Sequence, residues 1–491
     1  MTLRRSPFDQ VYSAINVIHD PIIQNVEGAN GMAGRKGRQR PVRVGQQGKM
    51  EITGLGHAGE GVGRIDGFAV FVPGAVPGDR ILVEIEKIKR NHGRGRIVKI
   101  VRPAGGRVSP ACAVAGDCGG CQLQQMEYGE QLEWKRRLVL DALSRIGNFD
   151  HPKVQPVIGM EHPYGYRNKV QYPVALAKGR IALGFYQRGT HEIVPIKECS
   201  NSHPLCNKAL RVMSSVLEEY GLLPYSELTG SGLIRHLIFR VSTARDQLMI
   251  ILVTNDTDIP GIEKLIDSMT ANLQELVAVA QNVNQERTNV IMGEETHLLW
   301  GKPYLIEELN GLKFAISPRS FFQVNSQQAA VLCQKVVDYT AIGPGTRALD
   351  CYCGTGSIAL HLAREGAQVI GIEAVPEAIA DARLNGELNK IRQVDFRIGQ
   401  VEKELPVILP EGPVDVAVLD PPRKGCEPEV LEALIGAEIP RVVYVSCNPS
   451  SLARDLSILA NSGYELQKVQ PVDMFPQTSH VETVVLMSQG Q

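Results

Sequence analysis

The last third of the chain alternates short apolar segments with helical ones, and this pattern constrains its fold more than any other feature. From about residue 314 the apolar segments appear in turn as RALD at 347–350, QVIGIE at 368–373, VDVAVLD at 414–420 and RVVYVSC at 441–447. Strands that alternate with helices form parallel sheets covered on both faces. Residues 314–491 are therefore predicted to form a doubly wound, Rossmann-like α/β domain.

Polar and glycine residues follow the first two of these strands, at the edge where open α/β sheets bind ligands. Asp350-Cys-Tyr352-Cys-Gly354-Thr-Gly356 leads directly into a predicted helix, and its glycines let a ligand approach the backbone at the helix N-terminus. Glu373 ends the next strand, where an acid can accept hydrogen bonds from ribose hydroxyls. One short glycine turn without a P-loop lysine indicates a nucleoside that lacks a pyrophosphate. S-adenosylmethionine fits best, and a plain strand–turn–helix corner is the alternative.

The next two strands end in residues with chemical potential. Asp420-Pro-Pro-Arg423 follows the third strand, and it resembles the loops of amino-directed methyltransferases, with a proline-rich turn as the plain alternative. Cys447 follows the fourth strand and precedes a predicted helix, whose N-terminus favours a thiolate. A buried filler cysteine is the alternative reading of that position.

A uracil ring gives these residues a common purpose. Carbon 5 of uracil is a poor nucleophile, and addition of a thiolate to C6 makes it nucleophilic. After methyl transfer to C5 a base must remove the C5 proton. Glu482, in the string His480-Val481-Glu482 before the last predicted strand, is the candidate base, and a purely structural acid is the alternative.

Charge is distributed unevenly along the chain. The whole chain has a net charge of −1, but residues 35–107 hold 16 Lys and Arg against six Asp and Glu, so this window is +10 and the remainder −11. The same region contains short alternating strands separated by Gly and Pro turns. A small basic β-barrel is typical of an oligonucleotide-binding platform, and a solvated basic face is the alternative. The string Gly54–Gly59 fits G-x-G-x-x-G but leads into another strand, so a turn is predicted there.

The ten cysteines suggest metal binding or catalysis. The N-terminus shows no apolar signal segment, which predicts a cytoplasmic protein in which disulfides are disfavoured. Cys112, Cys118 and Cys121 share one Gly-rich loop, and Cys199 completes a set of four thiolates for a [4Fe–4S] cluster or zinc. Two alternatives remain: the thiols bind no metal, or Cys206 takes the place of Cys199 as the fourth ligand. No apolar run is long enough for a membrane span, so no membrane partner is predicted.

With these motifs together, the sequence resembles the RNA uracil-C5 methyltransferase family, specifically its iron–sulfur branch that methylates 23S ribosomal RNA. The N-terminal barrel is similar to the TRAM domain of that family, and the resemblance covers residues 41–491. The matching strings are Ser320-Phe-Phe-Gln-Val-Asn325, DCYCGTG at 350–356, Asp420-Pro-Pro-Arg423, Val445-Ser-Cys-Asn-Pro449, Leu452-Ala-Arg-Asp455 and His480-Val-Glu482.

The resemblance also assigns roles to residues. It implies that Cys447 is the nucleophile and Glu482 the general base. The donor is implied to contact Gln323, Tyr352, Gly354, Glu373 and Asp420. The target base is implied to contact Phe321 and Asp420. The implied ligands of the cluster are Cys112, Cys118, Cys121 and Cys199. The expected parts are a flexible basic tail (1–40), an OB-like TRAM barrel (41–103), a central α+β domain with the iron–sulfur loop (104–313) and the methyltransferase domain (314–491), with which 124–155 is implied to pack.

We therefore expect an S-adenosylmethionine-dependent enzyme that forms 5-methyluridine in structured RNA. 23S ribosomal RNA is the favoured substrate and transfer RNA the alternative. An amino-directed methyltransferase would not need Cys447, and a folate- and flavin-dependent methylase would need a true dinucleotide-binding unit. A non-catalytic iron–sulfur RNA-binding protein is the rival from another class. No obligate protein partner is predicted.

Overall fold

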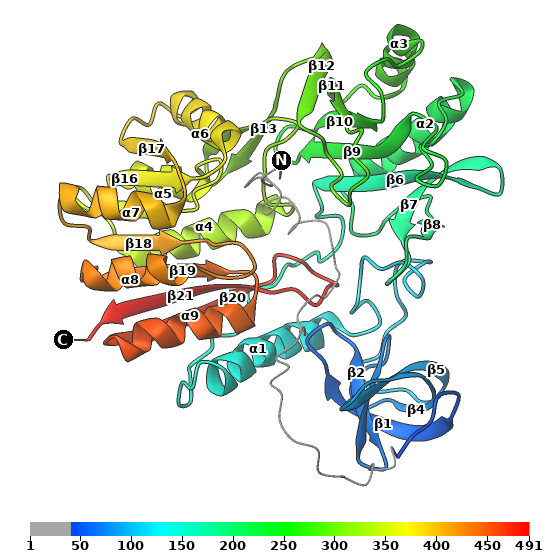
Figure 1. Ribbon diagram of the computed structural model, residues 1–491, viewed down its shortest axis with the longest axis horizontal. Helices are drawn as coiled ribbons and strands as arrows, with labels where there is room; N and C mark the ends of the chain where they lie inside the picture. The colour runs from blue at the N-terminus through cyan, green and yellow to red at the C-terminus, as the bar shows by residue number, and fades with distance from the viewer. Residues whose placement is uncertain (1–40, 491) are drawn as a thin grey trace, which may run out of the picture. The chain divides into compact units, whose positions relative to one another are not determined.

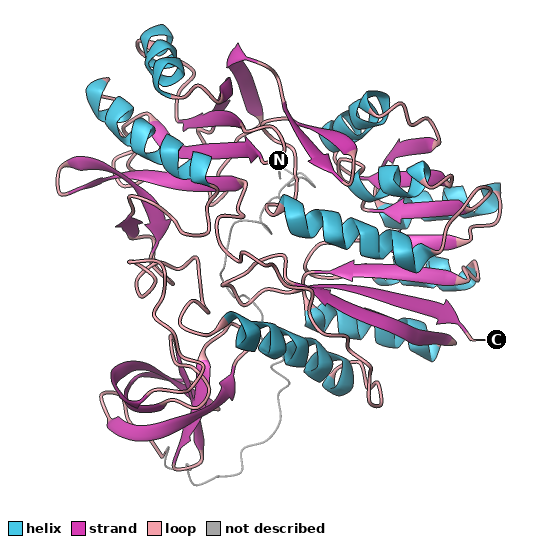
Figure 2. Cartoon of the chain, turned by 180° about the vertical axis from the view of Figure 1, so that it is seen from behind, coloured by secondary structure: helices cyan, strands magenta, loops and turns pink. Residues whose placement is uncertain are grey.

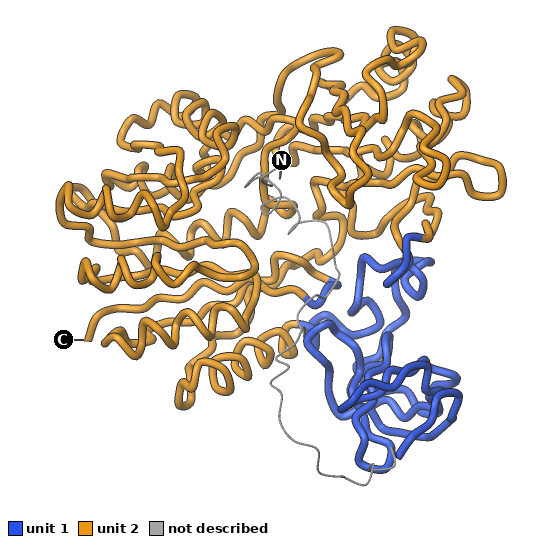
Figure 3. The backbone as a smooth tube through the Cα atoms, viewed as in Figure 1, with its two compact units in different colours: residues 1–131, 187–191, 477–479 blue, residues 132–186, 192–476, 480–491 orange. Residues whose placement is uncertain are grey.

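The computed structural model describes residues 41–490 (Figure 1), and the predicted basic tail lies outside them. The chain divides into two compact units, coloured separately in Figure 3. The described part of unit 1 comprises residues 41–131, 187–191 and 477–479, and that of unit 2 comprises residues 132–186, 192–476 and 480–490.

Unit 1 contains the predicted β-barrel, which is confirmed. Its strands are β1 (Gln47–Leu55), β2 (Gly61–Ile65), β3 (Phe68–Val72), β4 (Arg80–Ile88) and β5 (His92–Arg102), closed in the order β1-β2-β3-β5-β4. Alternate apolar side chains, such as Ile81, Val83 and Ile85 of β4, fill its core. The G-x-G-x-x-G string forms the turn between β1 and β2, where the Gly59 N–H donates to the Gly56 carbonyl.

The middle of unit 2 is a mixed sheet with helices on one face. Its strands are β6 (Lys169–Ala177), β7 (Arg180–Tyr186), β8 (Ile193–Pro195), β9 (Ile234–Ser242), β10 (Gln247–Thr254), β11 (Leu276–Val283) and β12 (Glu295–Gly301), in the order β12-β11-β10-β9-β6-β7-β8. Helices α2 (Pro204–Glu219) and α3 (Ile262–Asn272) share a core with Ile250 and Leu252 of β10, whereas Ile251 and Val253 pack into a second core on the opposite face.

The second core is shared with the C-terminal sheet. A hairpin of β13 (Leu305–Leu309) and β14 (Leu312–Ile316) contributes to it, as does helix α4 (Ser326–Thr340). The C-terminal sheet has the order β17-β16-β15-β18-β19-β21-β20. Its strands are β15 (Arg347–Cys351), β16 (Gln368–Glu373), β17 (Val394–Ile398), β18 (Val416–Leu419), β19 (Arg441–Ser446), β20 (Tyr464–Val472) and β21 (Glu482–Gln489).

Successive strand residues of the C-terminal sheet face opposite cores, because side chains alternate across a strand. Val443 packs with helices α4, α5 (Ser357–Arg364) and α6 (Pro376–Leu388), and Tyr444 packs with α8 (Pro428–Gly436) and α9 (Pro449–Asn461). Helix α7 (Val401–Ile408) lies on the α8 and α9 face, and α1 (Tyr128–Arg145) adds Val139 and Leu143 to the same core. Figure 2 shows helices flanking both faces of this sheet, so the doubly wound prediction is confirmed.

Within residues 41–490, none of the helices combines the length and apolar character that crossing a membrane requires.

Candidate active site

Neighbouring strands of the C-terminal sheet bring the predicted catalytic and donor residues to one edge. Strands β16, β15, β18 and β19 run parallel, and their carboxyl ends carry Glu373, Asp350, Asp420 and Cys447. Strand β21 pairs antiparallel with β19, so Glu482, its first residue, lies at the same edge. The order of strands in the sheet therefore places a donor-type acid at one end of the row and the thiol and base candidates at the other.

Cys447 is half-buried between two acidic side chains. Burial raises the pKa of its thiol well above the usual value, and the carboxyl groups of Glu482 and Asp420 raise it further. The guanidinium of Arg423 acts in the opposite direction. The net direction is contrary to the thiolate expected from the helix N-terminus alone, because burial, reinforced by the surrounding carboxyls, outweighs that effect.

The two carboxyl groups beside Cys447 titrate near neutral pH. Burial, followed by repulsion from Asp420, raises the pKa of Glu482 to about 8. Burial raises the pKa of Asp420 to about 7. Carboxyls with pKa values close to the working pH can accept and release protons during a reaction, and such values concentrate at functional sites.

The loop that carries Asp420 is fastened to the start of helix α9, directly after Cys447. The side-chain amide of Asn448 donates to the carbonyl of Arg423 at 3.0 Å, and the Ser451 hydroxyl donates to the same carbonyl at 3.1 Å. The Asn448 side-chain oxygen also accepts from the Ser450 N–H and so caps the helix. Asn448 and Ser451 thus hold the loop of Asp420 against the start of the helix that follows Cys447.

Asp455, on α9, holds the next part of this loop. Its Oδ2 accepts from the Cys426 N–H at 2.9 Å and from the Tyr444 hydroxyl at 2.6 Å, and only 1% of the residue is exposed. A Cβ on Gly425 would collide with the same oxygen, and Gly425 has a φ of +87°. A residue with a side chain would therefore displace the loop from the carboxylate.

The glycine turn after β15 forms an open cradle. Gly354 has a φ of +54°, and a Cβ built there would meet no atom within 4 Å. Its N–H donates to Glu373 Oε2 at 3.2 Å, while the Val375 N–H donates to Oε1 at 2.9 Å. Tyr352, at a φ of +69°, adopts a backbone conformation that is rare for a residue with a side chain. The turn thus exposes backbone next to the fixed carboxylate of Glu373.

Asp350 is a residue whose role sequence reasoning did not assign, although it begins the DCYCGTG string. It is fully buried, and neither carboxylate oxygen has a hydrogen-bond partner among residues 41–490. Burial and the carboxyl of Asp420 raise its pKa, and the backbone N–H of Ala359 opposes part of this rise. An unpartnered buried carboxyl beside an open glycine turn fits a polar ligand such as the predicted nucleoside.

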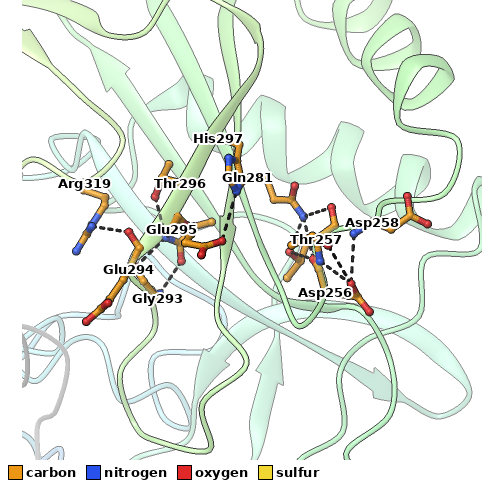
Figure 4. Close-up of polar contacts among 12 residues, drawn as sticks. Asp256, Thr257, Asp258, Gln281, Gly293, Glu294, Glu295, Thr296, His297 and Arg319 are labelled. Carbon is orange, nitrogen blue, oxygen red and sulfur yellow. Dashed lines mark hydrogen bonds and ion pairs between the residues drawn. The ribbon is translucent and has the colours of Figure 1, made fainter.

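The Ser320–Asn325 string places one exposed aromatic ring between anchored neighbours. Phe321 is 49% exposed, whereas Phe322 is buried against Phe314. The Ser320 hydroxyl bonds to Asp381, and the Arg319 guanidinium donates to the Glu294 carbonyl at 2.7 Å (Figure 4). The loop is therefore held in place while the ring of Phe321 is exposed to solvent. Such exposure is expected of a ring that contacts an RNA base.

Gln323 lies where this loop enters helix α4. Its carbonyl accepts from the Asn168 side chain at 3.1 Å, and its own side chain is half-buried. Asn325, two residues on, caps α4 by accepting from the Gln328 N–H. The backbone at Gln323 is thus fixed from both the central sheet and the helix.

The cysteine loop belongs to unit 1. Cys112, Cys118 and Cys121 are half-buried, and the Gly120 N–H donates to Cys118 Sγ at 3.4 Å. The pKa of Arg188 is lowered by its burial, and the thiols of Cys118 and Cys121 favour its charged form. Arg188 also donates to the carbonyl of Cys121 at 3.5 Å. This loop therefore contains thiols beside a cation.

The other two candidate ligands lie in unit 2, where Cys206 is a core residue. Cys206 is fully buried on α2, and burial raises its pKa. Cys199 is half-buried, and its N–H donates to Asn207 Oδ1 at 2.9 Å. Within residues 41–490 no three or more His, Cys, Asp or Glu side chains are grouped so that they could hold a metal ion. The three clustered cysteines belong to unit 1, and Cys199 belongs to unit 2.

Comparisons with known proteins agree with this architecture. Residues 41–98 match the TRAM domain and residues 342–471 match a methyltransferase domain. An uncharacterized RNA methyltransferase of Clostridium tetani is 43% identical over 91% of this chain and 97% of its own, and one of Halalkalibacterium halodurans is 41% identical over 92% and 98%.

A solved structure is similar over nearly the whole chain. The tRNA (uracil-54, C5)-methyltransferase of Pyrococcus abyssi, determined with S-adenosyl-L-homocysteine, superposes with a TM-score of 0.73 at 29% identity, covering 89% of this chain and 99% of its own. Both bacterial relatives are more than 40% identical to this chain over almost their full length. The matched length includes the barrel, the strand-edge site and the methyltransferase sheet, so all three belong to one protein family. The chain belongs to the TRAM-containing RNA methyltransferases.

Proposed function

We propose that this RNA methyltransferase forms 5-methyluridine, with S-adenosylmethionine as methyl donor and Cys447 as nucleophile. The observation that carries the proposal is the meeting of the Cys447 thiol with the carboxyls of Glu482 and Asp420 at adjacent strand ends. An amino-directed methyltransferase has no use for a thiol at that place. The similarity to the Pyrococcus abyssi tRNA (uracil-54, C5)-methyltransferase supports the same chemistry.

The donor would be held by residues at the ends of β15 and β16. Glu373 and Gly354 offer a carboxylate and open backbone, and Asp350 adds a buried carboxyl. Tyr352 is part of the DCYCGTG string with Gly354, and Gln323 is part of the Ser320–Asn325 string. When bound, S-adenosylmethionine supplies a methyl group on a positively charged sulfur, which leaves as neutral S-adenosylhomocysteine. The acidic lining at this edge suits a donor that carries positive charge.

Catalysis begins at Cys447. Its thiolate adds to C6 of a uracil that has left the RNA stack, and the electron pair of the C5–C6 bond moves into an enolate. Burial and the carboxyls of Glu482 and Asp420 disfavour the thiolate, while Arg423 favours it. The thiol proton therefore passes to the ionised carboxyl of Asp420 as the sulfur adds to C6, which leaves Glu482 free to accept the later proton. The exposed ring of Phe321 would contact the flipped nucleotide.

Completion of the reaction requires a base. The enolate carbon C5 attacks the methyl group, forming a C5–CH₃ bond as the donor sulfur takes the bonding electron pair. Glu482 then accepts the C5 proton, the electron pair re-forms the C5–C6 double bond, and the C6–Sγ bond breaks to return the thiolate. The pKa of Glu482, about 8, suits it to accept a proton near neutral or mildly basic pH.

RNA containing 5-fluorouridine tests this assignment directly. Fluorine at C5 cannot leave as a proton, so a methylated covalent enzyme–RNA adduct is expected, visible by denaturing electrophoresis and mass spectrometry. Cys447→Ala removes the sulfur that forms the bond and is expected to give no adduct. A wild-type protein that methylates RNA yet never forms the adduct would refute the nucleophile.

The proposed RNA target is 23S ribosomal RNA, with transfer RNA as the second candidate. The resemblance of the motif set supports the former, and the Pyrococcus abyssi enzyme, which is named for tRNA, favours the latter. Mass spectrometry of nucleosides from separated ribosomal and transfer RNA, in cells with and without the gene, decides between them. Loss of 5-methyluridine from transfer RNA alone would refute the ribosomal target.

A [4Fe–4S] cluster on Cys112, Cys118, Cys121 and Cys199 stays a prediction of the sequence, and no catalytic step depends on it. Iron and sulfide analysis of protein purified without oxygen, together with a broad visible absorbance, checks it. About four irons per chain that disappear in Cys118→Ser are expected. Stoichiometric zinc, or no metal, would count against the cluster.

A further inference from the structure

The segment before β21, residues 473–476, is anchored at every one of its residues. It forms part of the loop that joins β20 to β21, drawn in red in Figure 1. Its side-chain and carbonyl oxygens accept hydrogen bonds from three different parts of unit 2. The bonds run from Lys135 Nζ to Asp473 Oδ1 (2.5 Å), from Asn325 Nδ2 to the Met474 carbonyl (3.1 Å), from Lys135 Nζ to the Phe475 carbonyl (3.1 Å) and from the Tyr166 hydroxyl to the Pro476 carbonyl (3.0 Å).

Lys135 is the only one of these donors that bonds to two residues of the segment, and its position is unusual. The side chains of Lys135 and Asp473 are both completely buried. Burial lowers the pKa of Lys135, and Asp473 opposes that shift. A buried ion pair is often no more stabilising than two apolar side chains of the same size. What the pair provides, and an apolar pair does not, is a fixed direction for the Asp473 side chain and the Phe475 carbonyl.

The anchored segment leads directly to the catalytic edge. His480 packs edge-on against the ring of Phe475, with their centroids 6.0 Å apart. Burial and the charges of Arg423 and Lys135 lower the pKa of His480 to about 4, so this ring is neutral. Two residues later Glu482 begins β21. A shift of the segment would therefore move the base relative to Cys447.

We propose that Lys135 and Asp473 are positioning residues, whose ion pair fixes segment 473–476 and thereby the carboxyl of Glu482 beside the target base. The proposal rests on the function proposed above, in which Glu482 removes the C5 proton. Loss of the pair slows proton removal and the breaking of the C6–Sγ bond more than it slows addition of Cys447. The methylated covalent adduct then accumulates on ordinary uridine RNA.

The decisive variant removes both charges at once. Lys135→Met leaves the Asp473 carboxylate buried without its cation and can unfold the site, whereas Lys135→Met/Asp473→Leu fills the same space with apolar groups. The matched control is Lys208→Met, which breaks the pair between Lys208 of α2 and Glu275, the residue before β11, a partly exposed pair outside the anchored segment. Thermal unfolding and circular dichroism establish that the double variant and the control are folded.

Single-turnover reactions with ordinary uridine RNA then separate the two halves of catalysis. The double variant is expected to release 5-methyluridine roughly 10- to 100-fold more slowly than wild type, the range that a displaced catalytic group produces, while adduct forms at nearly the wild-type rate. Glu482→Gln is expected to accumulate the same adduct, and Lys208→Met to behave as wild type.

Two results would overturn the positioning role. One is a folded double variant that releases product at the wild-type rate, and the other is an equal decrease in adduct formation and release. A parallel reaction of wild type with 5-fluorouridine RNA keeps the proposals distinguishable. If wild type forms no adduct with 5-fluorouridine RNA, both the nucleophile assignment and the positioning role are refuted. If wild type forms the adduct but the double variant releases product at the wild-type rate, only the positioning role is refuted.

Discussion

Cys447 is placed where its own ionisation is disfavoured. Burial and the carboxyls of Glu482 and Asp420 raise its pKa, and Arg423 opposes them only in part. A permanently ionised thiol would be open to oxidation, whereas a protonated one reacts only when the surrounding charges change. The site thus places the Cys447 thiol and the carboxyls of Asp420 and Glu482 close together, so that ionisation of one disfavours ionisation of the others. The pH dependence of the reaction follows from this mutual repulsion.

Product formation is expected to rise with pH between about 6 and 8. Asp420 and Glu482, with pKa values of about 7 and 8, are protonated at the acid end of this range, and Glu482 must be ionised to accept the C5 proton. Single-turnover rates measured across this range check the prediction. In Glu482→Gln the upper part of the rise should vanish, and a profile identical to that of wild type would contradict the assignment of the base.

Glu482→Gln is expected to stabilise the protein at high pH. The folded protein keeps Glu482 protonated up to about pH 8, whereas the unfolded chain ionises it near 4.5, so the stability contributed by the neutral carboxyl is complete below 4.5 and lost as pH rises to 8. Glutamine is neutral throughout. The variant should match wild type at pH 4 and exceed it above pH 8, by about 5 kcal/mol at most. Denaturant unfolding at both pH values measures the difference, and equal stability at pH 9 would contradict it.

At the scale of single elements, the turn between β15 and α5 contains two glycines with different roles, one in ligand binding and one in folding. Gly354 and Gly356 both have positive φ, but their surroundings differ. A Cβ at Gly354 points into open space, whereas one at Gly356 would lie 2.9 Å from the Phe396 ring and 3.2 Å from Ala382. The first glycine therefore leaves room for a ligand, and the second lets α5 begin against α6 and β17.

Alanine at these two positions should have opposite consequences. Gly354→Ala is expected to lower stability by about 1 kcal/mol through left-handed backbone strain, and to weaken S-adenosylhomocysteine binding at least tenfold because its methyl group enters the cradle. Gly356→Ala should lower the melting temperature further, since overpacking adds about 1–3 kcal/mol. Calorimetric titration and thermal unfolding of both variants test this pair. Unchanged S-adenosylhomocysteine binding in Gly354→Ala would show that the donor does not bind against this turn.

At the scale of the whole molecule, charge is divided between functions. The net charge of −1 combines a basic N-terminal region with an acidic remainder. On the barrel, Arg94 and Arg96 of β5 are paired with glutamates, whereas Lys99 and Arg102 form no ion pair with any residue of the described chain. Both are exposed, so they are available to RNA phosphates.

Replacing Lys99 and Arg102 by glutamine should weaken RNA binding uniformly across sequences. The slope of log K against log salt is expected to become shallower by about 1 for every phosphate that the variant no longer neutralises. Binding measured at several salt concentrations gives this slope, and Lys264→Gln on α3 of the central domain serves as control. A double variant with the wild-type slope would mean that this face of β5 does not contact RNA.

The sequence by itself determined the barrel and the C-terminal sheet, because alternation of apolar residues and glycine turns are local signals. It also singled out Cys447, Asp420, Glu373 and Glu482, since each stands at a strand end. The tertiary structure alone decided that strand order brings the thiol between two acids. It raised the pKa of Cys447 against the local expectation, because burial and repulsion depend on residues distant in sequence. The Lys135–Asp473 pair joins residues more than 300 positions apart, and no local pattern predicts such a contact.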